Sequence, residues 1–168
     1  MVKLNVGCGG VKLPGYIGID SNPRSGADII KPAHNLPYKE GTVDEIRSSH
    51  MLEHVKLLSA TLSEWFRVLK PGGLLWIRVP NFEVYVREWL KGDKDYRIGL
   101  GLINLYGHQD KGPGMYTRTG FTCWRFKFLL PRFGFVDVKC RVGETRVRSW
   151  PDWRENGDIF CECRKPRA

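Results

Sequence analysis

Short apolar runs alternate along the chain with polar, glycine-rich or amphipathic stretches. The run at 74–79 is almost continuously apolar, as in a strand that is covered on both faces. Strands that alternate with helices or loops predict an α/β fold with a mostly parallel sheet, in which the last two strands can pair as an antiparallel hairpin at one edge. The expected strands are 2–8, 16–20, 27–30, 43–49, 74–79, one within 133–142, and 158–164.

Three segments have a helical pattern. In the first, from about 50 to 70, apolar residues recur every three or four positions, and Pro71-Gly72-Gly73 provides a stop. Further helices are expected at 82–91 and 120–131. The stretch 92–119 between them is glycine-rich and too long for a plain connection, which indicates a functional loop or lid.

The first strand runs directly into Gly7-Cys8-Gly9-Gly10, and the second ends on Asp20. A strand, a glycine turn and a second strand that ends on an acid predict a nucleotide site at the carboxyl edge of a parallel sheet. Glycines let the backbone approach a ligand closely, and a carboxylate can accept hydrogen bonds from both ribose hydroxyls. The alternative role of Asp20 is to cap the turn that follows it. The link between the two strands is too short for a full helix, so a tight loop is expected.

Length, charge and cysteines narrow the class of protein. The 168 residues suit one domain, and no apolar run approaches the length of a membrane span. The strand pattern begins at once, so no signal peptide is expected. Five cysteines without a framework spacing then predict reduced thiols in a cytoplasmic protein. The net charge of +9 favours anionic partners, nucleic acid among them.

The glycine motif resembles that of the class I S-adenosylmethionine-dependent methyltransferases, in which an acidic residue, any residue and Gly-x-Gly-x-Gly follow the first strand. Gly7 and Gly9 occupy the first two glycine positions, whereas Asn5 stands at the acidic position and Val11 at the third glycine. The sequence is similar to small bacterial predicted methyltransferases of the type 11 kind, often associated with sugar and surface-polysaccharide genes. Further shared motifs are Leu36-Pro37-Tyr38, Val43-Asp44, 49–54, 67–73, Tyr106-Gly107-His108 and Gly120-Phe121-Thr122.

This resemblance implies a single methyltransferase domain over 1–168, Rossmann-like, with seven strands of which the last is antiparallel. It implies S-adenosylmethionine as cofactor and a methyl acceptor that presents oxygen or nitrogen, expected to be a small anionic molecule or a glycan. The segment 92–122 would cover the acceptor site, with His108 as the first candidate for the base and His54 as the second. The implied cofactor-binding residues are Asn5, Gly7, Cys8, Gly9, Asp20, Asn35, Leu36, Ser49 and His50.

The sequence also allows three other interpretations of its function. The run 50–54 spells His-x-x-Glu-His, a zinc-peptidase motif, but no further acidic ligand is evident, and no metal is expected. A non-catalytic nucleic-acid-binding module on the same fold would use the positive charge, although no known RNA or DNA motif is present. A dinucleotide-dependent dehydrogenase lacks its third glycine and its phosphate-binding helix here.

Overall fold

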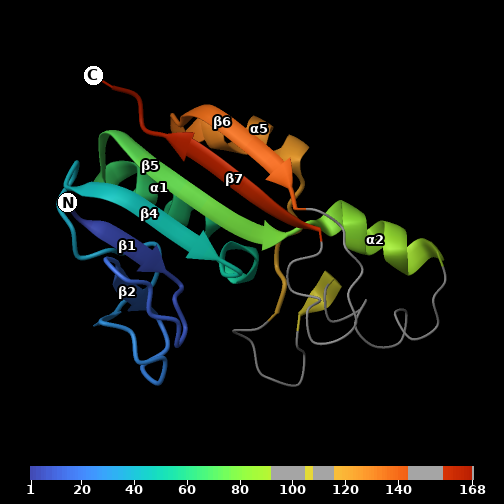
Figure 1. Ribbon diagram of the computed structural model, residues 1–168, viewed down its shortest axis with the longest axis horizontal. Coiled ribbons are helices and arrows are strands. Elements are labelled where there is room, and N and C mark those ends of the chain that lie inside the picture. Colours follow the sequence, from blue (N-terminus) through green and yellow to red (C-terminus); the bar gives the residue numbers. More distant parts are fainter. Residues whose placement is uncertain (92–104, 108–115, 144–156, 168) are drawn as a thin grey trace.

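The structure is a computed structural model that describes residues 1–91, 105–107, 116–143 and 157–167. Its centre is a seven-stranded sheet in the order β3-β2-β1-β4-β5-β7-β6 (Figure 1). Strands β1 to β5 are mutually parallel, and β7 is antiparallel to both of its neighbours. This confirms the predicted fold class. The strands are β1 (Lys3–Val6), β2 (Ile17–Asp20), β3 (Ile29–Ile30), β4 (Val43–Ser49), β5 (Leu69–Pro80), β6 (Val136–Val142) and β7 (Asp158–Arg164).

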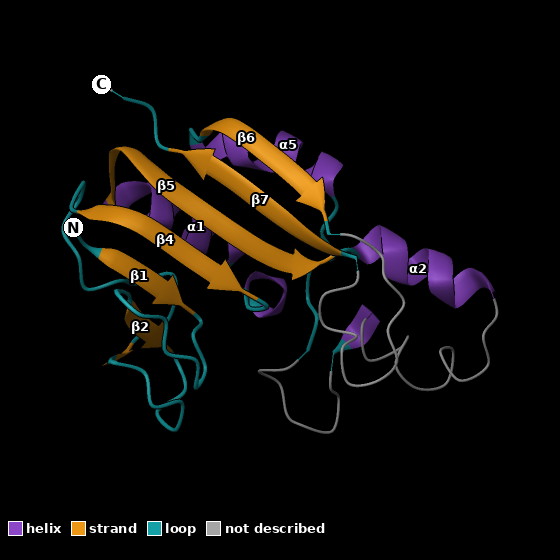
Figure 2. Ribbon diagram, viewed as in Figure 1, coloured by secondary structure: helices purple, strands orange, loops and turns teal. Residues whose placement is uncertain are grey.

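The described helices that pack on the sheet lie on one of its faces. Helix α1 (Leu58–Val68) and helix α5 (Cys123–Leu129) both lie behind the sheet in Figure 2, while α2 (Phe82–Lys91) continues beyond the end of β5. Two short 3-10 helices, η1 (Leu52–His54) and η4 (Leu130–Phe133), follow β4 and α5. The core lies between this face and the two helices, and its largest fully buried side chains include Trp65, Phe121, Phe126, Phe135, Leu4 and Ile46.

The single helix expected over 50–70 is wrong. The chain forms one 3-10 turn, becomes extended at Val55 with a ψ of 138°, and only then enters α1. Moreover, Pro71-Gly72-Gly73 was expected to end the helix, but α1 already ends at Val68 and these three residues lie inside β5. The apolar spacing predicted the buried stripe correctly, because Leu52 and Leu62 are both in the core. It could not show that two separate segments supply that stripe.

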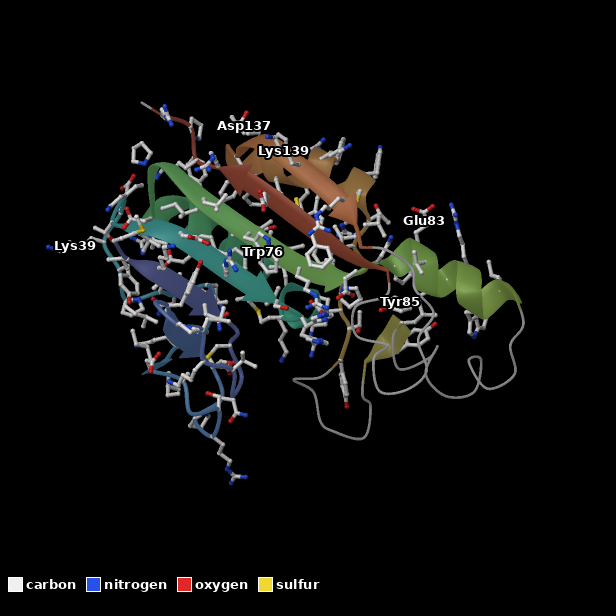
Figure 3. The ribbon with its side chains drawn as sticks, in the orientation of Figure 1. Lys39, Trp76, Glu83, Tyr85, Asp137 and Lys139 are labelled. Atoms are coloured by element: carbon white, nitrogen blue, oxygen red, sulfur yellow. The ribbon has the colours of Figure 1, made fainter. Side chains whose placement is uncertain are left out.

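The opposite face of the sheet is covered by no helix that the structure describes. Residues 7–16 connect β1 to β2 as a loop without a helix, as their length predicted. The expectation that 74–79 is covered on both faces is wrong, since Leu75, Ile77 and Val79 are fully buried whereas Trp76 and Arg78 point the other way and are only partly buried. Figure 3 shows Trp76 in front of the sheet.

The described part of the chain contains no helix of the length and hydrophobicity that a membrane span requires.

Candidate functional site

A cavity of about 810 Å³ lies where β1, β2 and β4 end. Because parallel strands present their carboxyl ends at one edge, the first glycine turn, the acid of β2 and the segment after β4 meet there. Basic groups dominate its charged lining, since Asp20 is the one carboxylate among the described residues that line it. The cavity is lined by Val6, Gly7, Gly9, Gly10, 20–22, Ser25, 31–34, His50, Met51, 54–57 and Thr61.

The two glycines of the turn are required for different reasons. Gly7 has a φ of +73°, and a Cβ there would lie 2.1 Å from Cγ of Met51. The space that a side chain at Gly7 would need is therefore filled by Met51. Gly9 has a φ of +52°, and a Cβ there would meet no atom within 4 Å. Both line the cavity. The expected close approach to a ligand therefore fits Gly9, whereas Gly7 makes room for Met51.

Asp20 ties the glycine turn to the end of β2. Its Oδ2 accepts a hydrogen bond from the Gly9 amide at 2.8 Å, and its Oδ1 accepts one from the Asn22 amide at 2.8 Å. The turn-capping role is therefore present. Each carboxylate oxygen still has a second lone pair, and the side chain borders the cavity. Capping and ribose binding are thus compatible at this residue.

Five of the implied cofactor residues do not line this cavity. Asn5 is buried, and its side-chain amide donates to the Val11 carbonyl at 3.2 Å, which closes the loop after β1. The Cys8 thiol is buried too, and burial together with the nearby Asp20 carboxylate raises its pKa. Leu36 belongs to the core, while Asn35 is exposed and Ser49 is half-buried beside His50. Pro32, Ala33 and His34 line the cavity in place of Asn35 and Leu36.

His50 sits at the end of β4 in a left-handed conformation, with a φ of +51°. Its Nε2 lies 3.0 Å from Oδ2 of Asp158, and its Nδ1 lies 3.6 Å from Oε1 of Glu53. Asp158 also accepts a 2.7 Å hydrogen bond from Nε of Arg78. Burial alone would lower the pKa of His50, but the two carboxylates outweigh it and raise that pKa to about 9. His50 is therefore a cation at neutral pH and cannot accept a proton.

His54 has a different environment four residues later. Its Nδ1 lies 2.9 Å from the carbonyl oxygen of Tyr116, and because a carbonyl only accepts, Nδ1 carries the proton. The neutral ring then has its lone pair on Nε2, which lies 3.7 Å from Oε1 of Glu53. The imidazole lines the cavity. In the neutral ring, Nε2 is therefore the nitrogen that can accept a proton.

The segment expected to cover the acceptor site is described only at 105–107 and 116–122. Tyr116 supplies the carbonyl for His54, and the amides of Arg118 and Thr119 donate to the Glu53 carbonyl at 2.7 and 3.2 Å. This part of the segment therefore packs against Glu53 and His54. His108 lies outside the described residues, so its assignment as the base stays a prediction.

The geometry does not match the zinc-peptidase reading of residues 50–54. That reading needs both histidines on one helix face, but His50 precedes a 3-10 turn and pairs with Asp158. Within the described ranges, no three His, Cys, Asp or Glu side chains are arranged to hold a metal ion.

Sequence reasoning missed Asp158 and the basic residues at 31–34 and 56. A signal for Asp158 existed, because it opens the strand that was expected to be antiparallel. The start of an antiparallel strand lies at the same edge as the ends of the parallel ones. No comparable signal marked Lys31, His34 or Lys56, which reach the cavity from irregular segments.

Comparison with known proteins agrees with this geometry. The family model for a methyltransferase domain matches residues 4–77. A Thermotoga maritima S-adenosylmethionine-dependent methyltransferase superposes with a TM-score of 0.69 at 18% identity, over 98% of this chain and 82% of that one. One from Methanosarcina mazei gives 0.66 at 20% identity, over 99% and 92%.

A more distant structural match is a Haemonchus contortus phosphoethanolamine N-methyltransferase, in complex with phosphomonomethylethanolamine and S-adenosylhomocysteine. It gives a TM-score of 0.62 at 13% identity, over 98% of this chain but only 49% of that one, so the chain spans about half its length. No curated protein sequence matches the chain.

The solved structures and the glycine turn agree on the α/β fold of S-adenosylmethionine-dependent methyltransferases. The methyltransferase-domain family model matches the first part of that fold, residues 4–77.

Proposed function

We propose that the protein transfers the methyl group of S-adenosylmethionine to an oxygen or nitrogen of a small anionic acceptor, a sugar acid or a phosphorylated alcohol or amine, with His54 as the base. The observation that carries this proposal is the His54 ring, which lines the cavity with Nδ1 fixed by the Tyr116 carbonyl at 2.9 Å. The fixed tautomer leaves Nε2 free to take a proton from the acceptor.

The cofactor would lie along the glycine turn. Gly9 leaves open space in the cavity wall, and Asp20 offers two acceptor oxygens for a ribose. The 32–34 segment lines the cavity in place of Asn35 and Leu36 and would border the adenine. Asn5 and Cys8 would act indirectly, by holding the turn in shape. When bound, S-adenosylmethionine supplies a methyl group that its sulfonium already activates. The protein then has mainly to align donor and acceptor, which can contribute up to about 7–11 kcal/mol.

Charge supports an anionic acceptor. Among the described residues, the cavity wall has several basic side chains and one acidic side chain, so it favours a negatively charged ligand. Structural similarity to an enzyme crystallised with a phosphorylated amine is consistent with the same class of acceptor. The lysines and histidines in the wall are Lys31, His34, His50, His54 and Lys56.

After proton transfer, His54 would become a cation. Oε1 of Glu53, which is almost fully buried, lies 3.7 Å from Nε2 and would stabilise that cation. The same oxygen lies 3.6 Å from Nδ1 of His50. Glu53 therefore faces both histidines. It would stabilise His50 as a cation at neutral pH and His54 as a cation during the reaction.

The test is a screen for formation of S-adenosylhomocysteine with matched acceptor pairs, such as a hexose and its uronic acid, or ethanolamine and phosphoethanolamine. We expect turnover with the anionic member of a pair and little with the neutral one. Preference for the neutral members would overturn the acceptor class. Calorimetric titration with S-adenosylhomocysteine tests the cofactor site separately, so the two parts of the proposal can fail independently.

A further inference from the structure

The sheet face that no described helix covers has an ordered pattern of side chains. Cations and aromatic rings lie in contact with one another across it, from the start of β2 to β6. We call this set the cation–aromatic stripe. It consists of Lys3, Tyr16, Arg47, Trp76, Phe160 and Arg141, which come from β1, the residue before β2, β4, β5, β7 and β6.

The contacts within the stripe are continuous. The Arg47 guanidinium lies 5.4 Å from the Tyr16 ring centroid and 5.2 Å from that of Trp76. The Trp76 and Phe160 centroids are 6.0 Å apart, and Arg141 lies 4.3 Å from Phe160. All these distances fall within the range of cation–π or aromatic pairing.

Strand register places these residues on the same face. Arg47 is directly opposite Trp76 in the β4–β5 pair, and Phe160 is opposite Arg141 in the β7–β6 pair. The stripe therefore crosses about 24 Å of sheet, since neighbouring strands lie about 4.8 Å apart. Figure 3 shows Trp76, at its centre, in front of the ribbon, on the side away from α1 and α5. No described residue forms a second layer there.

The charges on this face are mostly positive. Glu45 is shared between Lys3 at 3.1 Å and Arg47 at 2.9 Å, and it also accepts from the Tyr16 hydroxyl at 2.6 Å. Glu162, beside Trp76, has Lys139 as its cross-strand neighbour. Because the single Glu45 carboxylate pairs with both Lys3 and Arg47, these three residues keep one positive charge in excess. The exposed Arg141 side chain adds another positive charge. Water still reaches 40% of the Arg47 side chain.

These features fit a particular kind of occupant. An apolar helix would bury more positive than negative side chains on this face, which is costly. A single-stranded nucleic acid supplies phosphates for the cations, and its bases can stack on aromatic rings and guanidinium planes. Duplex DNA supplies the phosphates but keeps its base faces stacked inside the helix.

We propose that the cation–aromatic stripe is a binding surface for single-stranded nucleic acid, separate from the methyl-transfer cavity. The surface lies on the flat face of the sheet, whereas the cavity lies at the strand ends. The protein's net charge of +9 agrees with such a partner.

The test measures anisotropy of a fluorescein-labelled oligouridine with the full chain, against unlabelled polyphosphate, duplex DNA and polyglutamate as competitors. Trp76→Leu removes the central ring, and Arg47→Gln removes a central cation. The matched controls are Trp124→Leu and Arg132→Gln on the α5 side, where Trp124 is 71% exposed and Arg132 lies over Phe128.

We expect Trp76→Leu to weaken oligouridine binding about tenfold and leave polyphosphate binding unchanged. Arg47→Gln should weaken both and reduce the salt slope by about one. The control variants should bind like the wild type, and all four should bind S-adenosylhomocysteine normally, which keeps this result independent of the proposed function. If Trp76→Leu does not fold, Phe160→Leu replaces it.

The proposal is overturned if the wild type does not bind oligouridine at physiological salt, or if polyphosphate binds equally well and Trp76→Leu has no effect. A loss of binding in Trp124→Leu but not in Trp76→Leu would move the surface to α5. Displacement of the labelled oligouridine by polyglutamate at lower concentration than by unlabelled oligouridine would overturn the proposal and assign the stripe to an acidic protein partner.

Discussion

Nε2 of His50 lies 3.0 Å from Oδ2 of Asp158, although 108 residues separate them in sequence. The pair joins the end of a parallel strand to the start of the antiparallel one at the edge of the cavity. Because Glu53 also faces the ring, the His50 cation is held between two carboxylates. The consequences of this pair can be measured in the absence of any ligand.

The first prediction concerns stability and pH. The folded pKa of His50, about 9, lies above the value of about 6.5 expected in the unfolded chain. The resulting stabilisation is therefore complete below about pH 6.5 and is lost as pH rises through about 9. A shift of that size corresponds to ~3 kcal/mol before screening, and because 36% of the side chain is exposed we expect about 1–2 kcal/mol.

Chemical denaturation of wild type and His50→Gln between pH 6 and 9.5 measures this difference. It should be largest at the acid end and shrink toward the alkaline end. In an Asp158→Asn background the same substitution should lose most of its pH dependence. A wild-type advantage that grows with pH would contradict the ion pair.

The second prediction separates ligand contact from backbone strain. Gly9→Ala should lower affinity for S-adenosylhomocysteine at least about tenfold, because its Cβ would enter the open space beside the cavity. Gly15→Ala is the matched control, with a φ of +78° and equally open surroundings, but outside the cavity lining. Both should destabilise the protein by about 1 kcal/mol. Equal affinities in calorimetry would show that Gly9 serves only the turn.

A third substitution, Gly7→Val, should abolish cofactor binding indirectly. A side chain at Gly7 collides with Met51 and must also adopt a positive φ. We therefore expect a fall in melting temperature greater than that for Gly15→Ala, together with loss of binding. Normal binding by a folded Gly7→Val protein would show that the turn and Met51 can move apart freely.

The fourth prediction is that Asp20→Ala weakens S-adenosylhomocysteine binding tenfold or more. A hydrogen bond to a charged group is worth about 1.5–3 kcal/mol, and two ribose hydroxyls would lose their acceptor. Asp28→Ala is the control, since Asp28 accepts from the Gly18 amide at 2.7 Å without lining the cavity. Calorimetry should show weakened binding only for Asp20→Ala. Unchanged affinity there would remove Asp20 from the site.

The fifth prediction assigns the base. His54→Gln should keep S-adenosylhomocysteine affinity within about twofold and lower turnover by about 10²-fold or more, since glutamine can donate to the Tyr116 carbonyl but cannot take a proton. His34→Gln, at another part of the cavity wall, should retain turnover within a few-fold. If His54→Gln turns over normally and His108→Ala does not, the base is His108.

The sequence predicted the sheet well because local signals defined each strand. The strands at 43–49 and 158–164 were placed at their observed ends, and the antiparallel direction of the last one followed from the resemblance. Helix bounds were less accurate. Val55 interrupts the segment at 50–70 because the chain turns there from β4 to α1, a tertiary requirement that side-chain spacing does not encode.

The sequence predicted the site residues that belong to a recognisable motif. It misplaced those whose position depends on tertiary packing. Gly9 and Asp20 follow from the order strand, glycines, strand and acid. Leu36, by contrast, was implied as a cofactor-binding residue but is in the core, where its amide donates to Glu64 at 2.8 Å. The open face of the sheet was unexpected as well, because an apolar run does not show whether a second layer exists.

The most direct test of the methyl-transfer site is a crystal structure of the protein with S-adenosylhomocysteine. The account predicts ribose hydroxyls within hydrogen-bond distance of the Asp20 carboxylate, the adenine against the 32–34 segment, and the sulfur open toward Nε2 of His54. An acceptor atom between sulfur and Nε2 would then lie within about 2.6–3.2 Å of the imidazole. S-adenosylhomocysteine bound away from the glycine turn, or with its sulfur facing away from His54, would contradict it.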